Sequence, residues 1–143
     1  MVGVVIFTHG TLGESLIRSA ELIVGKPKNC VSVGLEHGDS LTEFEKRCAE
    51  SIEAVDEGEG VIAFVDFYGG TPANTVIKYR NKRKMPCVTG VNMPMLLEVL
   101  TARTQCRSLN ELEVICVKTG KENIFEIGAK LKKHNKDSDN TDF

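Results

Sequence analysis

Four short apolar runs alternate along the chain with stretches in which apolar residues recur at helical spacing. The first and third runs are continuous and rich in β-branched residues, which is typical of strands buried on both faces. They cover residues 2–7, 31–35, 60–65 and 87–91. Helices are expected between and after them, over residues 11–24 and 41–55, from Thr71 onward, and over 94–102.

Local signals mark where two of these helices begin. Ser40 and Glu43 form a capping box, S-x-x-E, in front of the second helix. Thr71 is a favourable N-cap, and Pro72 suits the first helical position of the third helix. Strands that alternate with helices require right-handed crossovers and parallel pairing. The pattern therefore predicts a doubly wound α/β domain with a mainly parallel four-stranded sheet and helices on both faces.

The C-terminal third has a more ambiguous pattern. Ser108 and Glu111 could cap another helix, but the run 114–117 would equally suit a strand. Apolar residues at 124, 127 and 131 predict a final helical turn or two. Residues 132–143 are polar without an apolar stripe, so we expect a flexible tail after a single domain over 1–131.

Composition narrows the possible functions. The chain has 18 basic and 20 acidic residues and a formal charge of −2, so nothing suggests a nucleic-acid partner. No run approaches the length of about 18 apolar residues that a membrane span needs. The five cysteines are widely spaced and contain no C-x-x-C pair, which argues against a disulfide framework or a zinc site. These features predict a cytoplasmic protein.

Polar or glycine-bearing segments follow all four predicted strands. Ligands of open parallel sheets bind beyond the carboxyl ends of the strands, so these segments should share one edge. If the first and third strands are neighbours, His9 and Asp66 can meet there, since each stands at the end of its apolar run. A carboxylate on one imidazole nitrogen fixes the tautomer and leaves the other nitrogen free as a nucleophile. Other residues expected at this edge are Thr8, His37, Phe67, Asn92 and Met93.

The same edge offers donors for a phosphoryl group on His9. The pair Gly69-Gly70 allows close backbone approach, and Thr71 adds a hydroxyl at the start of a helix. Gly10 and Thr11 begin a second helix just after the histidine. Phosphoryl transfer needs mainly positioning and charge stabilisation, so neither a metal nor another cofactor is expected.

Three alternatives use the same residues. His37 and Asp39 could join His9 and Asp66 in a metal site, although their spacing matches no ligand motif. The edge could instead hold an anionic metabolite without catalysis, as a regulatory module. A hydrolase that uses the His–Asp pair on water is the third possibility.

Three ordered motifs resemble the enzyme IIA component of the mannose family in the bacterial phosphoenolpyruvate-dependent sugar phosphotransferase system. They are V-x-x-x-T-H-G at 4–10, V-D-x-x-G-G-T-P-x-N at 65–74 and G-V-N-M-P-M-L-x-E at 90–98. The resemblance spans residues 1–131 and implies a strand order of 2-1-3-4. It also implies a homodimer, with an antiparallel strand exchanged from the C-terminal part.

The resemblance assigns roles at matching positions. It implies a phosphotransferase in which His9 is phosphorylated on Nε2, Asp66 orients it, and the loop with Thr71 holds the phosphoryl oxygens. The implied donor is the histidine-containing phosphocarrier protein, and the acceptor is a histidine of enzyme IIB, expected on a separate chain. Through these partners the chain would serve a membrane sugar permease indirectly. Some members carry a hydroxyl residue directly after the aspartate, where this chain has Phe67.

Overall fold

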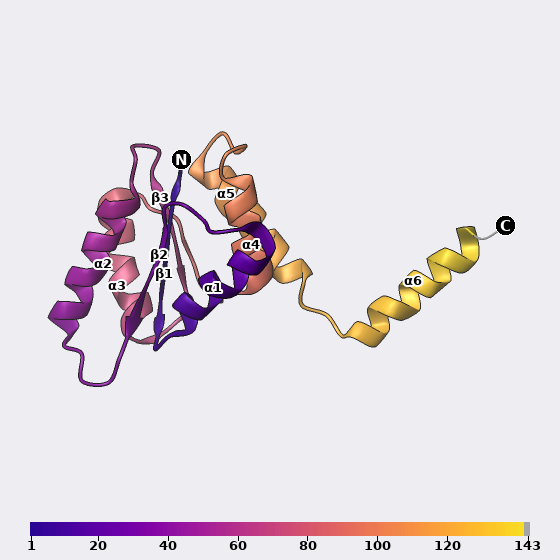
Figure 1. Ribbon diagram of the computed structural model, residues 1–143, viewed down its shortest axis with the longest axis horizontal. Helices are drawn as coiled ribbons and strands as arrows, with labels where there is room; N and C mark the ends of the chain where they lie inside the picture. Colours follow the sequence, from indigo (N-terminus) through magenta and orange to yellow (C-terminus); the bar gives the residue numbers. More distant parts are fainter. Residues whose placement is uncertain (142–143) are drawn as a thin grey trace.

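A computed structural model describes residues 1–141 of the chain, and the side chains of residues 1–135. Four parallel strands form one sheet in the order β2-β1-β3-β4, which confirms the predicted fold (Figure 1). The elements are β1 (Gly3–His9), α1 (Leu12–Val24), β2 (Cys30–Leu35), α2 (Leu41–Val55), β3 (Val61–Val65), α3 (Gly70–Arg83), β4 (Cys87–Val88), α4 (Met93–Ala102), α5 (Leu109–Glu122) and α6 (Ile127–Thr141).

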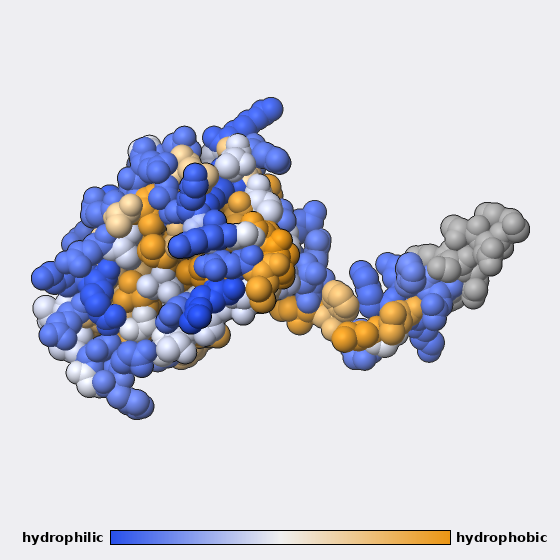
Figure 2. Space-filling view, in the orientation of Figure 1, coloured by the Kyte–Doolittle hydropathy of each residue, from blue (hydrophilic) through white to orange (hydrophobic). Residues whose placement is uncertain are grey.

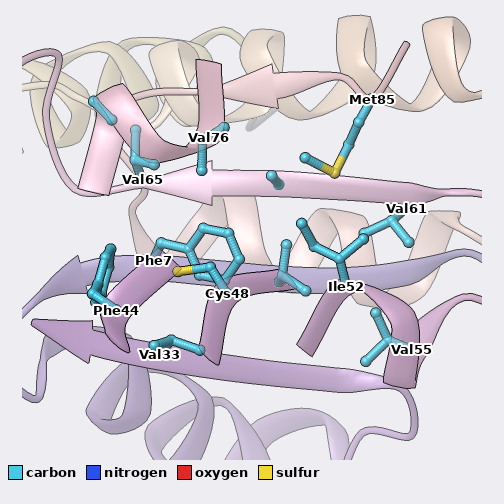
Figure 3. Close-up of a cluster of buried hydrophobic side chains, with 13 residues drawn as sticks. Phe7, Val33, Phe44, Cys48, Ile52, Val55, Val61, Val65, Val76 and Met85 are labelled. Atoms are coloured by element: carbon cyan, nitrogen blue, oxygen red, sulfur yellow. The ribbon is translucent and has the colours of Figure 1, made fainter. Parts of the chain in front are cut away.

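Helices cover both faces of the sheet, with α2 and α3 on one side and α1, α4 and α5 on the other (Figure 1). Alternation along β1 supplies both cores, because Val5 and Phe7 point to the first side and Val4 and Ile6 to the second. The first core also takes in Val33, Phe44, Cys48, Ile52, Val55, Val61, Val65, Val76 and Met85 (Figure 3). Burial on both faces explains why β3, and β1 up to Phe7, are apolar without interruption, whereas β2 contains Ser32 and is only partly buried.

The register places the ends of β1 and β3 side by side. Phe7 pairs with Val65, and His9 pairs with Leu35 on the opposite neighbour, β2. The chain therefore winds in opposite directions on the two sides of β1. In sheets of this kind the carboxyl ends of the two strands at that reversal flank the ligand site.

Most boundaries lie within two residues of those predicted, and two differences affect the edge of the sheet. β4 is limited to Cys87–Val88, whereas a strand over 87–91 was expected, because Gly90 turns the chain with a φ of +74°. α3 begins at Gly70 with Gly69 as its N-cap, so Thr71 lies inside the first turn and is not the cap. Gly69 and Gly70 have φ values of +143° and +75°, which only glycine adopts readily.

The C-terminal third is helical in the described residues. Ser108 accepts a hydrogen bond from Glu111 N at 3.1 Å, as the helix alternative predicted, and starts α5. The strand alternative for residues 114–117 is wrong, since Leu112 and Cys116 lie one turn apart in the core while Val114 is exposed. Residues 1–141 contain no fifth strand that could be exchanged between copies.

The last helix is longer than the turn or two predicted, because α6 extends through Thr141, where a tail without regular structure was expected. It projects away from the three-layered body (Figure 1). Across residues 1–141, we find no helix long and apolar enough to cross a membrane.

Candidate active site

His9 and Asp66 meet at the carboxyl edge of the sheet. His9 is the last residue of β1, and Asp66 directly follows β3. One carboxylate oxygen, Oδ2 of Asp66, accepts a hydrogen bond from His9 N at 2.9 Å and lies 2.8 Å from His9 Nδ1. The other oxygen, Oδ1, accepts from Phe67 N at 3.0 Å. The carboxylate is thus held at both oxygens.

The surroundings of Asp66 keep it ionised. Burial would by itself raise the pKa of this carboxyl, but the hydrogen bonds from the His9 backbone, the His9 ring and the Phe67 backbone outweigh it. The pKa of Asp66 therefore lies below its ordinary value. An ionised carboxylate can only accept, so Nδ1 of His9 donates to it, and in the neutral ring Nε2 then has the free lone pair.

The free nitrogen of His9 lies against the start of α3. A Cβ placed on Gly70 would be 3.1 Å from both Cε1 and Nε2 of His9, so the glycine lets the ring approach the backbone closely. The first N–H groups of a helix have no partner inside it, and α3 has no acidic residue in its first turn. Since Gly70 is the first residue of α3, Nε2 lies beside the end of the helix that has unpaired N–H groups and a positive dipole.

The start of α1 is less available as an anion site. Gly10 N donates to Leu35 O at 2.8 Å, and α1 carries Glu14 in its first turn. Thr11 is the N-cap and is exposed, but its side chain makes no capping hydrogen bond. Of the two helix ends expected to hold phosphate, the geometry favours that of α3.

Thr8 and Asn92, both expected at the rim, instead accept hydrogen bonds from first-turn N–H groups of α1 and α4. Thr8 is fully buried, and its Oγ1 accepts from Gly13 N at 3.1 Å. Asn92 accepts from Met95 N at 3.0 Å and donates to Gly120 O at 3.2 Å. Met93 is the first residue of α4 and packs against the core cluster on that side of the sheet.

His37 lies in the exposed loop after β2, away from any metal-binding arrangement. Its neighbour Asp39 instead pairs with Arg47 at 2.7 Å and accepts from Glu36 N at 2.8 Å. Within the described part of the chain, no group of three or more His, Cys, Asp or Glu side chains is arranged to hold a metal ion.

One residue that shapes the site, Gly34 in β2, was not predicted from the sequence. A Cβ at this position would lie 2.0 Å from the carbonyl oxygen of Gly10, directly after His9. Gly34 therefore allows the β1–α1 turn to fold back over β2. The available signal was a glycine inside a predicted strand, which often marks close backbone approach.

Comparisons with known proteins match this chain to phosphotransferase-system (PTS) components. The family described as "PTS system fructose IIA component" (EIIA-man) matches residues 3–115. The chain is 32% identical over 130 residues to the "PTS system mannose-specific EIIAB component" of Escherichia coli K12, a match covering 90% of this chain and 40% of that protein. It is 31% identical over 104 residues to the "PTS system fructose-specific EIIA component" of Bacillus subtilis, covering 72% of this chain and 71% of that one.

Solved structures share the fold. A phosphotransferase system component EIIA from Streptococcus agalactiae superposes with a TM-score of 0.83 at 22% identity, covering 90% of this chain and 99% of that one. A PTS IIA protein associated with the fucose utilization operon of Streptococcus pneumoniae gives 0.80 at 25% identity, covering 92% and 99%. The family match extends over most of the chain and includes both His9 and Asp66. The chain therefore belongs to the EIIA-man family of phosphotransferase-system enzyme IIA components.

Proposed function

We propose that this chain is a phosphocarrier that takes up a phosphoryl group on Nε2 of His9 and passes it to a second protein. The observation that supports this most directly is the orientation of His9. Asp66 holds Nδ1 at 2.8 Å, and the opposite nitrogen lies against the backbone of Gly70 at the start of α3. A nucleophile thus stands beside donors suited to phosphoryl oxygens.

In the proposed uptake step, the lone pair of His9 Nε2 forms a new N–P bond. The N–P bond of the donor's phosphohistidine breaks, and the donor imidazole leaves with that electron pair. The His9 ring keeps its proton on Nδ1 and gains a formal positive charge, which the carboxylate of Asp66 balances. Transfer onward reverses these changes, so no additional acid, base or metal is required.

The proposed partners follow from the family. The donor is the phosphorylated histidine-containing phosphocarrier protein, and the acceptor is a histidine of enzyme IIB. The Escherichia coli relative is named an EIIAB component, and this chain spans about 40% of its length. Through enzyme IIB the phosphoryl group would support uptake and phosphorylation of a sugar by a membrane permease. We place the chain in the cytoplasm, where its five free cysteines would stay reduced.

We also propose that the chain forms a homodimer. Apolar side chains at the start of α6 and just before it are exposed, and they form an apolar surface on the projecting segment (Figure 2). They are Ile124, Phe125, Ile127 and Leu131, with 74%, 49%, 69% and 55% of their surfaces exposed. A second copy that covers this surface would remove it from water. Sedimentation should give a dimer for the wild type and a monomer for Ile127→Glu.

The phosphocarrier role can be tested by reconstitution with labelled phosphoenolpyruvate, enzyme I and the phosphocarrier protein. The wild-type chain should take up acid-labile phosphate, and His9→Ala should take up none. His37→Ala is the matched control, since it removes another exposed histidine at the same edge of the sheet and should label normally. Label that persists in His9→Ala would refute the proposal.

The same experiment separates the alternatives. A stabilising shift in melting temperature on exposure to anions, without covalent phosphate, would favour a non-catalytic binding module. Release of inorganic phosphate within seconds in the absence of an acceptor would favour a hydrolase. Phosphate that stays on the chain until enzyme IIB is added supports a carrier.

A further inference from the structure

An aromatic ring lies over the proposed nucleophile. The rings of His9 and Phe67 are stacked, with centroids 5.3 Å apart and an angle of 26° between their planes. Phe67 is also 53% exposed, so its ring contacts His9 while much of its surface remains open to solvent. Its outward surface faces the solvent from which a partner would approach.

The local backbone is built to allow this stack. A Cβ on Gly69 would lie 3.2 Å from Cε2 of Phe67, closer than ordinary van der Waals contact, so glycine leaves room for the ring. Asp66 accepts hydrogen bonds from both Phe67 N and the His9 ring, which ties the two aromatic residues to one carboxylate. Gly69 therefore leaves room for the Phe67 ring, and Gly70 leaves room for the His9 ring.

We propose that Phe67 is a positioning residue that holds the plane of the His9 ring so that Nε2 faces the start of α3. This inference rests on the proposed function. The hydrogen bond to Asp66 fixes one edge of the imidazole, but a single bond leaves the ring free to rock about it. The stack restricts that motion from the face of the ring, and the backbone of Gly70 restricts it near Nε2.

A different role for an exposed aromatic residue is partner docking, and kinetics separate the two. Loss of a docking contact raises KM for the phosphorylated donor and leaves kcat unchanged. Loss of a positioning contact lowers kcat at saturating donor, because the ring reaches the reactive orientation less often. Stacked aromatic pairs contribute enough for roughly a 2- to 12-fold change in rate.

The test compares Phe67→Leu, Phe67→Tyr and Tyr68→Leu. Phe67→Leu keeps an apolar side chain but loses the stacking face, and we expect kcat to fall by roughly 2- to 12-fold. Phe67→Tyr keeps the face and should restore kcat. Tyr68→Leu is the matched control, because Tyr68 is the adjacent exposed aromatic residue, and its kcat should equal that of the wild type.

A second readout follows the ring itself without any transfer. The carbon-bound protons of the His9 ring should show a ring-current shift in the wild type and in Phe67→Tyr, and lose it in Phe67→Leu. Wild-type kcat in Phe67→Leu, or an increase confined to KM, would overturn the inference. Failure of the wild-type chain to label on His9 would instead refute the proposed function, while the ring-current result would still report on the stack.

Discussion

Gly70→Ala should impair phosphoryl transfer by displacing the nucleophile. The new Cβ would lie 3.1 Å from both Cε1 and Nε2 of His9, whereas ordinary contacts begin at 3.4 Å. The ring must therefore move by a few tenths of an ångström. That movement disturbs its 2.8 Å contact with Asp66 and its stack on Phe67. Since a displacement of about 1 Å at a reacting centre can cost about 10²-fold, we expect transfer to slow on the order of tenfold.

The same substitution also strains the backbone, so a control must separate strain from displacement. Gly70 has a φ of +75°, and a non-glycine residue in the left-handed region costs about 1 to 3 kcal/mol. Gly25, at the end of α1, has a φ of +80°, and a Cβ placed there would have nothing within 4 Å. Gly25→Ala should also lose stability through backbone strain, but it should keep the wild-type rate of transfer.

The assay combines urea unfolding with single-turnover transfer from the phosphorylated donor. We expect both variants to lose about 1 to 3 kcal/mol in the free energy of unfolding, and only Gly70→Ala to lose rate. Equal rates in the two variants would refute the conclusion that Gly70 positions His9. A rate loss in Gly25→Ala of the same size would attribute the effect to strain and refute it equally.

Three further predictions concern stability. The pKa of Asp66 is lowered from 3.8, so its ionised carboxylate should stabilise the fold above that pH and lose this contribution as the pH falls through the lower folded value. In urea unfolding, the stability of Asp66→Asn should therefore differ from that of the wild type at pH 6 and converge with it in strong acid. Thr8→Val removes the buried acceptor of Gly13 N and should cost about 1 to 2 kcal/mol by the same method, whereas unchanged stability would contradict the stabilising role of that hydrogen bond. Gly34→Ala places a Cβ 2.0 Å from Gly10 O and should lower stability by at least about 2 kcal/mol, seen as a fall in melting temperature. A wild-type melting temperature would show that the β1–α1 turn can move away from β2 without loss of stability.

Much of the fold could be predicted because its signals are local and redundant. The two central strands, β1 and β3, contain continuous apolar runs, since helices bury both faces of the sheet there. The hydroxyls of Ser40 and Ser108 cap the helices that the sequence predicted after them. The length of β4 could not be predicted, because its end depends on the conformation of Gly90. Residues 114–117 fit a strand equally well, and only the contacts of Leu112 and Cys116 with the core distinguish a helix.

The site was predictable to the extent that topology determines it. Parallel strands bring their carboxyl ends to one edge, so the order of strands is enough to bring His9 and Asp66 together. The side chains of Thr8 and Asn92 could face a ligand or accept from the first turn of a helix, and the sequence does not distinguish these roles. The stack of Phe67 on His9 depends on backbone turns at Gly69 that appear only in three dimensions.

The identity of the atom that carries the phosphoryl group is the central claim for this protein. NMR of the phosphorylated chain with ¹⁵N-labelled histidine reports it directly, through the coupling between phosphorus and a ring nitrogen. We predict coupling to Nε2 of His9, with a proton retained on Nδ1 toward Asp66. Phosphorus bonded to Nδ1, or to any residue other than His9, would contradict that claim.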